Sequence, residues 1–298
     1  MAFELPRRLS PSKVSSFKDC ALAFRFSAID RLPEPASLPA IKGTLVHAAL
    51  ERLFCLPAPD RTVDAALACL ADAFEALRQA PEVVGLELDA EAEAAFVADA
   101  DRLVRNYFLL EDPRTFEPIG VELRLQVQVG GLDLVGVIDR LDLDPQGELV
   151  VTDYKTGRAP TERHEQRRLG GVHFYSLLCE ELFGRRPARV QLLHLQEPVA
   201  LTALPSDQST QGLRVRVGAI WQAVERACAT EDFRPRPGPL CDWCAFQAYC
   251  PAFGGDPADA TAAAAAAAAE AVAEASAAGD GHRVVGPGTG SPVLVSTP

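Results

Sequence analysis

Alternation of apolar and polar residues marks the middle of the chain as a β-sheet. Between residues 119 and 129 every second residue is aliphatic, and the polar positions between them include Glu122, Arg124, Gln126 and Gln128. This period of two is typical of a strand buried on one face. Two glycines at 130–131 and the triplet PQG at 145–147 predict tight turns. The pattern therefore predicts a meander of three strands, at 119–129, 132–144 and 148–155.

Helical patterns flank this meander along the chain. A helix is expected to start within the segment 9–20, because Ser10 can cap it and Pro11 suits the first helical position. A proline-rich loop is expected at 32–40. Apolar spacing predicts a strand at 188–195 and helices at about 43–54, 62–80, 89–111, 161–184 and 209–230. This order predicts a mixed α/β fold with a small central sheet flanked by helices.

Composition divides the chain into a domain and a tail. We expect residues 1–255 to form one domain, in which the acidic, alanine-rich helices of 56–112 are an insertion and 231–253 is a cysteine-bearing segment. Alanine, glycine and proline predominate afterwards. We expect 256–298 to be disordered, with transient helix in the alanine run.

Charge bears on the choice of partner. The net charge of −12 argues weakly against nucleic acid. Eleven acidic and three basic side chains lie within 60–102, however, and 256–298 are also acidic, so the remaining chain is close to neutral. A local basic field suffices to hold phosphates. Arginines that could supply it are Arg158, Arg163, Arg167, Arg168, Arg185, Arg186 and Arg189.

The sequence carries no sign of secretion or membrane insertion. Residues 1–10 lack the apolar stretch of a signal peptide, and no apolar run is long enough to span a bilayer. We therefore expect a cytoplasmic protein. In that reducing compartment the eight cysteines are expected to be thiols or metal ligands rather than disulfides.

The stretch VVTDYKTG (150–157) places opposite charges on a segment that otherwise has the pattern of a buried strand. Side chains two apart on a strand point the same way, so Asp153 and Lys155 share a face. The hairpin can bring Asp139, from GVIDRLD, beside Asp153. Crowded carboxylates repel unless protons or a divalent cation neutralise them, and their oxygens suit Mg²⁺ or Mn²⁺. The alternative is a plain ion pair at a strand end.

Taken in order, the motifs resemble the PD-(D/E)XK nuclease superfamily, and in particular its RecB-like exonuclease branch, which includes the CRISPR-associated adaptation nucleases. The resemblance covers about residues 8–253. It rests on LSPSKVSSFKDC, GTLVHAALERLF, GVIDRLD, VVTDYKTG, HFYSLL and the last cysteines. It implies a restriction-endonuclease-like core.

The resemblance also implies a role for each matching residue. His47, Asp139 and Asp153 would bind a divalent metal, and the main-chain carbonyl of Tyr154 would complete the ligand set. Lys155 would be the catalytic lysine. From the residues alone, a lone histidine among small apolar neighbours is instead a packed or surface residue.

Two further residues are candidates, and one position departs from the family pattern. Glu122 lies where many relatives have a strand acid, and the alternative is a solvated strand residue. Tyr175 is either part of the site or a core aromatic. Relatives usually have a glutamine four residues before this tyrosine, where this chain has Gly171. Gln166 lies too far away along the helix to be assumed to replace it.

Cysteines near the end of the domain form the pattern C-x2-C-x5-C, at Cys241, Cys244 and Cys250. Cys20 could supply a fourth thiolate, and four thiolates suit either zinc or a four-iron four-sulfur cluster. The resemblance implies the iron–sulfur cluster, which would join the two ends of the domain. The other cysteines are expected to be buried small apolar residues, at Cys55, Cys69, Cys179 and Cys228.

These observations predict a metal-dependent DNA nuclease. The resemblance implies an exonuclease on single-stranded or frayed ends that acts in DNA repair or recombination. The alternatives are a weakly active or inactive DNA-binding module on the same fold and a zinc-containing hydrolase of another substrate. The chain lacks a G-x-x-x-x-G-K-[ST] loop, so any unwinding would need a separate helicase or recombination protein.

Overall fold

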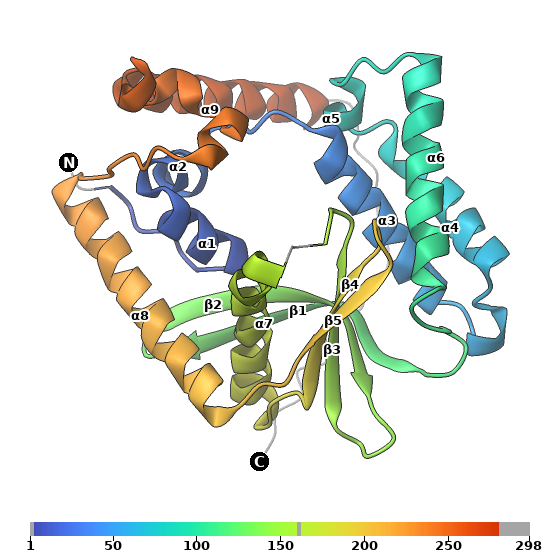
Figure 1. Ribbon diagram of the computed structural model, residues 1–298. Coiled ribbons are helices and arrows are strands. Elements are labelled where there is room, and N and C mark those ends of the chain that lie inside the picture. Colours follow the sequence, from blue (N-terminus) through green and yellow to red (C-terminus); the bar gives the residue numbers. More distant parts are fainter. Residues whose placement is uncertain (1–2, 160–161, 280–298) are drawn as a thin grey trace.

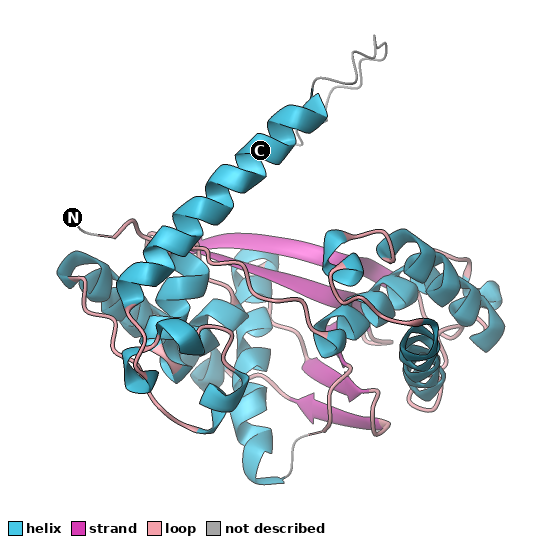
Figure 2. Ribbon diagram, turned by 90° about the horizontal axis from the view of Figure 1, so that it is seen from above, coloured by secondary structure: helices cyan, strands magenta, loops and turns pink. Residues whose placement is uncertain are grey.

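The computed structural model describes residues 3–159 and 162–279, with the backbone alone for 162–170, 172 and 270–279. A five-stranded sheet lies between helices (Figures 1 and 2). The strands are β1 (Pro118–Val129), β2 (Leu132–Leu143), β3 (Leu149–Lys155), β4 (Arg189–His194) and β5 (Val199–Ala203). The helices are α1 (Pro11–Asp19), α2 (Ala21–Phe24), α3 (Leu38–Phe54), α4 (Val63–Leu77), α5 (Pro81–Val84), α6 (Ala90–Tyr107), α7 (Glu162–Phe183), α8 (Asp207–Thr230) and α9 (Pro257–Gly279).

The strands follow chain order across the sheet. β1, β2 and β3 form the antiparallel meander, and β3 pairs in parallel with β4 after the crossover through α7. This mixed sheet flanked by helices confirms the predicted fold class. β5 pairs antiparallel with β4 and has no counterpart among the predicted strands. It is a five-residue edge strand, VALTA, with largely exposed side chains, so the apolar pattern is weak.

Two hydrophobic clusters enclose the sheet. One joins it to α1, α2, α7 and α8 and includes Val151 and Leu178, and the other joins it to α3, α4 and α6 and includes Leu50 and Tyr154. Val151 and Tyr154 lie three apart on β3 and therefore point to opposite faces. One strand thus contributes to both clusters, and the molecule has three layers.

Local sequence sets the turns and helix starts that hold these layers. Gly130 and Gly131 have φ angles of 57° and 83°, the two positive values that a two-residue hairpin turn requires. The Ser10 side chain accepts a hydrogen bond from the backbone N–H of Lys13 at the start of α1. Helix α3 begins at Leu38, inside the segment 32–40 predicted as a loop, because Ser37 caps it in the same way.

Helix α9 occupies Pro257–Gly279, within the segment 256–298 predicted to be disordered. Ala260 is fully buried in the cluster that contains α1 and α2, and Arg25 donates a hydrogen bond to Thr261 Oγ1 at 2.9 Å. These contacts anchor the first turns, and the alanine run extends the helix because alanine has the highest helix propensity. Residues 280–298 lie outside the described part of the chain.

Within residues 3–159 and 162–279, no helix combines the length and apolar character that a membrane crossing requires.

Two glycine substitutions should have opposite effects on stability. A Cβ on Gly136 of β2 would lie 2.7 Å from Cδ1 of the buried Leu178, whereas one on Gly171 of α7 would have no atom within 4 Å. Gly136→Ala should lower the free energy of unfolding by about 1–3 kcal/mol, because α7 must move away. Gly171→Ala should raise it by about 0.5–1 kcal/mol. Urea denaturation of both variants measures this, and a Gly136→Ala protein as stable as wild type would contradict the close packing.

Candidate metal centre

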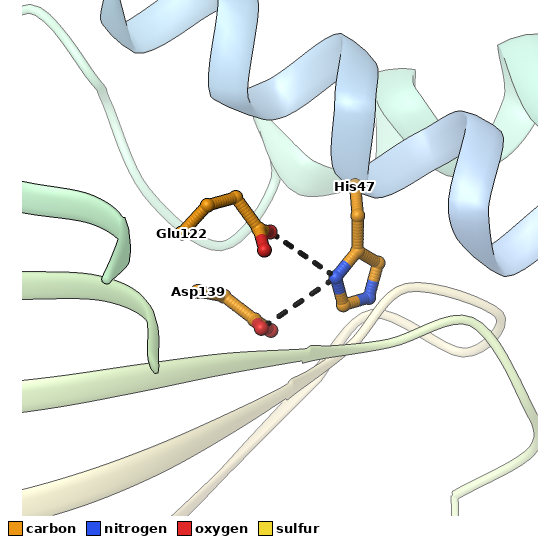
Figure 3. Close-up of side chains that lie close together, drawn as sticks. All are labelled: His47, Glu122 and Asp139. Atoms are coloured by element: carbon orange, nitrogen blue, oxygen red, sulfur yellow. Dashed lines mark ion pairs between the residues drawn. The ribbon is translucent and has the colours of Figure 1, made fainter. Parts of the chain in front are cut away.

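Helix α3 brings the side chain of His47 beside the acidic residues of β1 and β2. Its neighbours Leu45 and Val46 are fully buried and fix the helix between the sheet and the helices α4 and α6. The side chain of His47 is 28% exposed. It points toward Glu122 and Asp139 (Figure 3).

Three potential metal ligands converge at this point. His47 Nδ1 lies 3.7 Å from a Glu122 oxygen and 3.6 Å from an Asp139 oxygen. One ligand atom from each of the three residues lies within 4.8 Å of the other two. At the other ring nitrogen, Nε2 lies 3.1 Å from the main-chain carbonyl oxygen of Tyr154. The structure thus brings His47, Asp139 and this carbonyl together, and Glu122 belongs to the same group.

Glu122 has an unusual backbone conformation. Its φ is 45°, in the left-handed region, although β1 continues on both sides of it. Its two neighbours pair with the residues on either side of Asp139 in β2, so Glu122 lies opposite Asp139. A non-glycine residue held in this region costs about 1–3 kcal/mol, and such strain concentrates at functional sites. The strained backbone therefore belongs to the residue whose side chain lies beside His47.

Asp153 is held by two other groups. The Tyr175 hydroxyl donates to Oδ1 at 3.0 Å, and the Lys155 ammonium lies 2.5 Å from Oδ2. The aspartate side chain is 5% exposed and the lysine side chain 37%. Asp153 therefore stands beside the group of three ligands rather than within it. Tyr175 can reach the site from α7 because Gly136 presents no side chain to that helix.

Negative charge governs protonation at the centre. Burial alone would lower the pKa of His47, but the neighbouring carboxylates of Asp139 and Glu122 outweigh it and raise the pKa to about 10. Burial raises the pKa of Asp153 and the charge of Asp139 adds to this, while Lys155 opposes both. In the absence of a metal, an imidazolium cation therefore offsets the carboxylates at neutral pH.

This donor set fits a hard divalent cation. Carboxylate and carbonyl oxygens are the ligands that Mg²⁺ and Mn²⁺ prefer, and an imidazole is compatible with Mn²⁺. A divalent cation would take over the neutralising role of the imidazolium proton. Because His47 must lose that proton to act as a ligand, metal binding should tighten as the pH rises.

The remaining predicted residues around the centre are only partly described. Arg158 is exposed just after β3, and Gly171 is exposed one turn before Tyr175. No side chain at Gly171 can fill the place of the family's glutamine. Side chains that fall outside the described part of the chain are those of Arg163, Gln166, Arg167 and Arg168.

The four cysteines of the predicted cluster lie in one region. Cys20 precedes α2, and the other three lie in or beside the short 3₁₀ turns at Pro239–Trp243 and Gln247–Tyr249. All four are partly buried. Burial raises the pKa of Cys244, and the thiols of Cys20, Cys241 and Cys250 are close enough to add to the shift. Four neighbouring thiols fit a thiolate-bound centre.

The other cysteines only partly follow the sequence expectation. Cys179 and Cys228 are buried, and burial raises the pKa of the Cys179 thiol to about 12. Cys69 is half-buried and Cys55 is exposed, because Cys55 follows the last residue of α3 and no longer faces the core.

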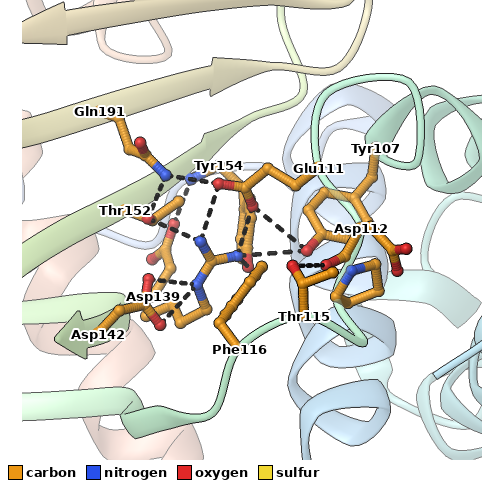
Figure 4. A network of polar contacts seen from close by, with 12 residues as sticks. Tyr107, Glu111, Asp112, Thr115, Phe116, Asp139, Asp142, Thr152, Tyr154 and Gln191 are labelled. Carbon is orange, nitrogen blue, oxygen red and sulfur yellow. Dashed lines mark hydrogen bonds and ion pairs between the residues drawn. The ribbon is translucent and has the colours of Figure 1, made fainter. Parts of the chain in front are cut away.

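Behind the centre lies a buried polar network that the sequence analysis leaves unassigned (Figure 4). It is built around Arg140, which pairs with Glu111 and Asp142. In DRLD (139–142), Arg140 and Asp142 alternate with Asp139, so they point away from it. This alternation of charged residues along one strand is the sequence pattern that could have predicted a second polar cluster on the opposite face of the sheet.

The raised pKa of His47 predicts how the stability of the metal-free protein changes with pH. A pKa of about 10 in the folded state exceeds the unfolded value of 6.5, so the stabilisation is complete below pH 6.5 and is lost as the pH rises toward 10. The slope cannot exceed about 1.4 kcal/mol per pH unit, because a single proton is involved. Chemical denaturation in the presence of a chelator measures the free energy of unfolding of wild type and of His47→Gln. The excess stability of wild type should shrink as the pH rises through this range. A constant difference between the two proteins would contradict the assignment.

Comparison with known proteins agrees with the geometry. A sequence profile described as the PD-(D/E)XK nuclease superfamily matches residues 8–251. No curated protein matches the chain. Among solved structures, a candidate exonuclease from Eubacterium rectale is similar with a TM-score of 0.51 and 12% identity, covering 80% of this chain and 87% of that one. The crystal structure of SSO0001 is similar with a TM-score of 0.37 and 14% identity, covering 84% and 88%.

The structural similarity to the Eubacterium rectale protein shows a shared fold. The profile match spans α1 to the last cysteine-bearing turns and contains every residue of the metal centre. The chain belongs to the PD-(D/E)XK nuclease superfamily.

Proposed function

We propose that the protein is a metal-dependent deoxyribonuclease of the RecB-like branch, which hydrolyses phosphodiester bonds. The observation that carries the proposal is the convergence of His47, Glu122 and Asp139 within 4.8 Å in a chain of this superfamily. The Tyr154 carbonyl and the Lys155 ammonium lie beside this group on β3.

The position of each residue supports a role in hydrolysis. A bound Mg²⁺ or Mn²⁺ would supply a Lewis acid that polarises the scissile phosphate and lowers the pKa of the attacking water. His47, Asp139, Asp153 and the Tyr154 carbonyl would hold this ion. The partly exposed Lys155 ammonium would orient the attacking water and stabilise the charge that develops on the phosphate.

Two residues would support this arrangement. Tyr175 donates to Asp153 Oδ1, and burial followed by the charge of Asp153 raises its pKa, so it remains a donor. It would hold the carboxylate in one orientation. Glu122 would provide a further ligand, because its oxygen and that of Asp139 face the same nitrogen of His47.

The proposed substrate is the end of a DNA strand, single-stranded or frayed, and the proposed role is in DNA repair or recombination. In support, the Eubacterium rectale structure of similar fold is described as a candidate exonuclease, and the exposed Arg158 could contact a phosphate. Unwinding would come from a separate helicase or recombination protein, and we expect the protein to act in the cytoplasm.

A second candidate function is DNA binding with little or no catalysis. The observation that favours it is Gly171, which leaves the position one turn before Tyr175 without the family's glutamine. The crowded carboxylates argue for the active form, because a protein that merely binds DNA has no use for negative charge beside a phosphate backbone.

For the cysteines we propose a four-iron four-sulfur cluster that joins the ends of the domain. The four thiols lie in one region, at the start of α2 and in the short turns that carry the last cysteines. Four thiolates suit either zinc or an iron–sulfur cluster. The resemblance to the RecB-like branch favours the iron–sulfur cluster.

Substitution of Lys155 tests the catalytic proposal. With Mn²⁺ and end-labelled single-stranded DNA, Lys155→Ala should reduce the cleavage rate by at least about 100-fold, because a donor to the transition state is lost. DNA affinity should change little, since one phosphate contact among several is lost.

Lys42→Ala is the matched control for this loss. Lys42 lies on the same helix as His47 but pairs with Asp99 of α6, outside the ligand group. The Lys42→Ala protein should cleave the DNA at the same rate as wild type. No cleavage by wild type, with DNA binding intact, would instead establish the binding module.

Cysteine substitutions test the cluster. Cys241→Ser should abolish the broad visible absorption of anaerobically purified protein and its bound iron and sulfide. Cys179→Ser should retain both, because that thiol is buried in α7. Elemental analysis that finds zinc and no sulfide in wild type would reject the iron–sulfur assignment.

A further inference from the structure

Arg140 is among the most deeply buried charged side chains in the described part of the chain. It follows Asp139 on β2, so its guanidinium lies on the face of the sheet opposite that carboxylate. Only 1% of the side chain is exposed. The rings of Phe54 and Phe116 lie 5.0 and 4.5 Å from the guanidinium carbon. A cation in such surroundings requires partners for all of its donors.

These partners are present on every side (Figure 4). Nε donates to both oxygens of Asp142, at 3.1 and 2.9 Å, and Nη1 and Nη2 each donate to one oxygen of Glu111, at 2.8 and 3.0 Å. The remaining bonds, at 3.1, 3.3 and 3.0 Å, go to the hydroxyl groups of Thr152, Tyr107 and Tyr154. Because the guanidinium is a rigid planar fork, two carboxylates on different sides determine its position.

Tyr154 connects this network to the metal centre. Its hydroxyl accepts from Arg140, its main-chain N–H donates to Asp139 Oδ2 at 2.6 Å, and its carbonyl oxygen lies 3.1 Å from His47 Nε2. The ring and the main-chain N–H of Tyr154 therefore have partners on opposite faces of the sheet, Arg140 and Asp139. A shift of the ring would move both the carbonyl and the group that orients Asp139.

We propose that Arg140 is a positioning residue for the metal centre: by holding the Tyr154 hydroxyl it fixes the peptide whose carbonyl and N–H set the ligand geometry. This inference rests on the proposed function, since it requires a cation at His47 and Asp139. In the competing view, Arg140 only neutralises the two carboxylates of its own network and stabilises the fold.

Tyr107 distinguishes the two views. Its hydroxyl also accepts from Arg140, at 3.3 Å, and donates to Glu111 at 3.3 Å. It is fully buried in the same cluster as Tyr154. Its main chain, however, belongs to the end of α6. Removing the Tyr107 hydroxyl therefore perturbs the network around Arg140 without changing a residue that contacts His47 or Asp139.

The experiment compares Tyr154→Phe with Tyr107→Phe in the full chain. Mn²⁺ is titrated into protein freed of divalent ions, and the free ion is followed by electron paramagnetic resonance, so that the readout is affinity rather than activity. Tyr154→Phe should weaken Mn²⁺ binding about 10-fold, and Tyr107→Phe should leave it within about 2-fold of wild type. Thermal unfolding should show both variants folded and similarly destabilised.

The outcomes separate this inference from the proposed function. Equal Mn²⁺ affinity of Tyr154→Phe and wild type would overturn the positioning role while leaving the metal centre intact, as would equal weakening by both variants. Failure of wild type to bind Mn²⁺ would overturn the proposed function itself. Arg140→Lys is the less informative variant, because it leaves buried carboxylates short of donors and threatens folding.

Discussion

Crowded carboxylates next to His47 must be neutralised, and this requirement governs the centre of the molecule. Glu122 and Asp139 lie within 3.7 Å of the imidazole, and the buried Asp153 stands alongside. In the metal-free protein two protein cations meet the requirement, an imidazolium whose pKa is raised to about 10 and the ammonium of Lys155. A divalent cation in place of the imidazolium proton would meet it better, because it carries two positive charges instead of one. The arrangement of charges therefore suits either a proton or a metal.

Both hydrophobic clusters contribute residues to this centre. His47 comes from α3 on one side of the sheet, and Tyr175, which donates to Asp153, comes from α7 on the other. On the face opposite Asp139, Arg140 pairs with both Glu111 and Asp142. The strand alternation thus separates this ionic network from the metal centre, and Tyr154 belongs to both.

Much of the fold follows from sequence pattern alone. The meander, the strand after α7 and the cap at Ser10 all have strong local signals, and the order of motifs identified the nuclease resemblance. The sequence pattern did not predict β5 or α9, because the pairing of an edge strand and the packing of Ala260 depend on tertiary contacts. At the centre, the positive φ of Glu122 and the partners of Arg140 depend on contacts between distant segments, which one sequence without relatives does not reveal.

Anomalous diffraction at the manganese edge, from crystals soaked in Mn²⁺, tests the central claim most directly. The account predicts one strong peak bounded by His47, Asp139 and the Tyr154 carbonyl oxygen, with Glu122 or Asp153 turned toward it. No peak at saturating Mn²⁺, or a peak at a site that excludes His47 and Asp139, would contradict it.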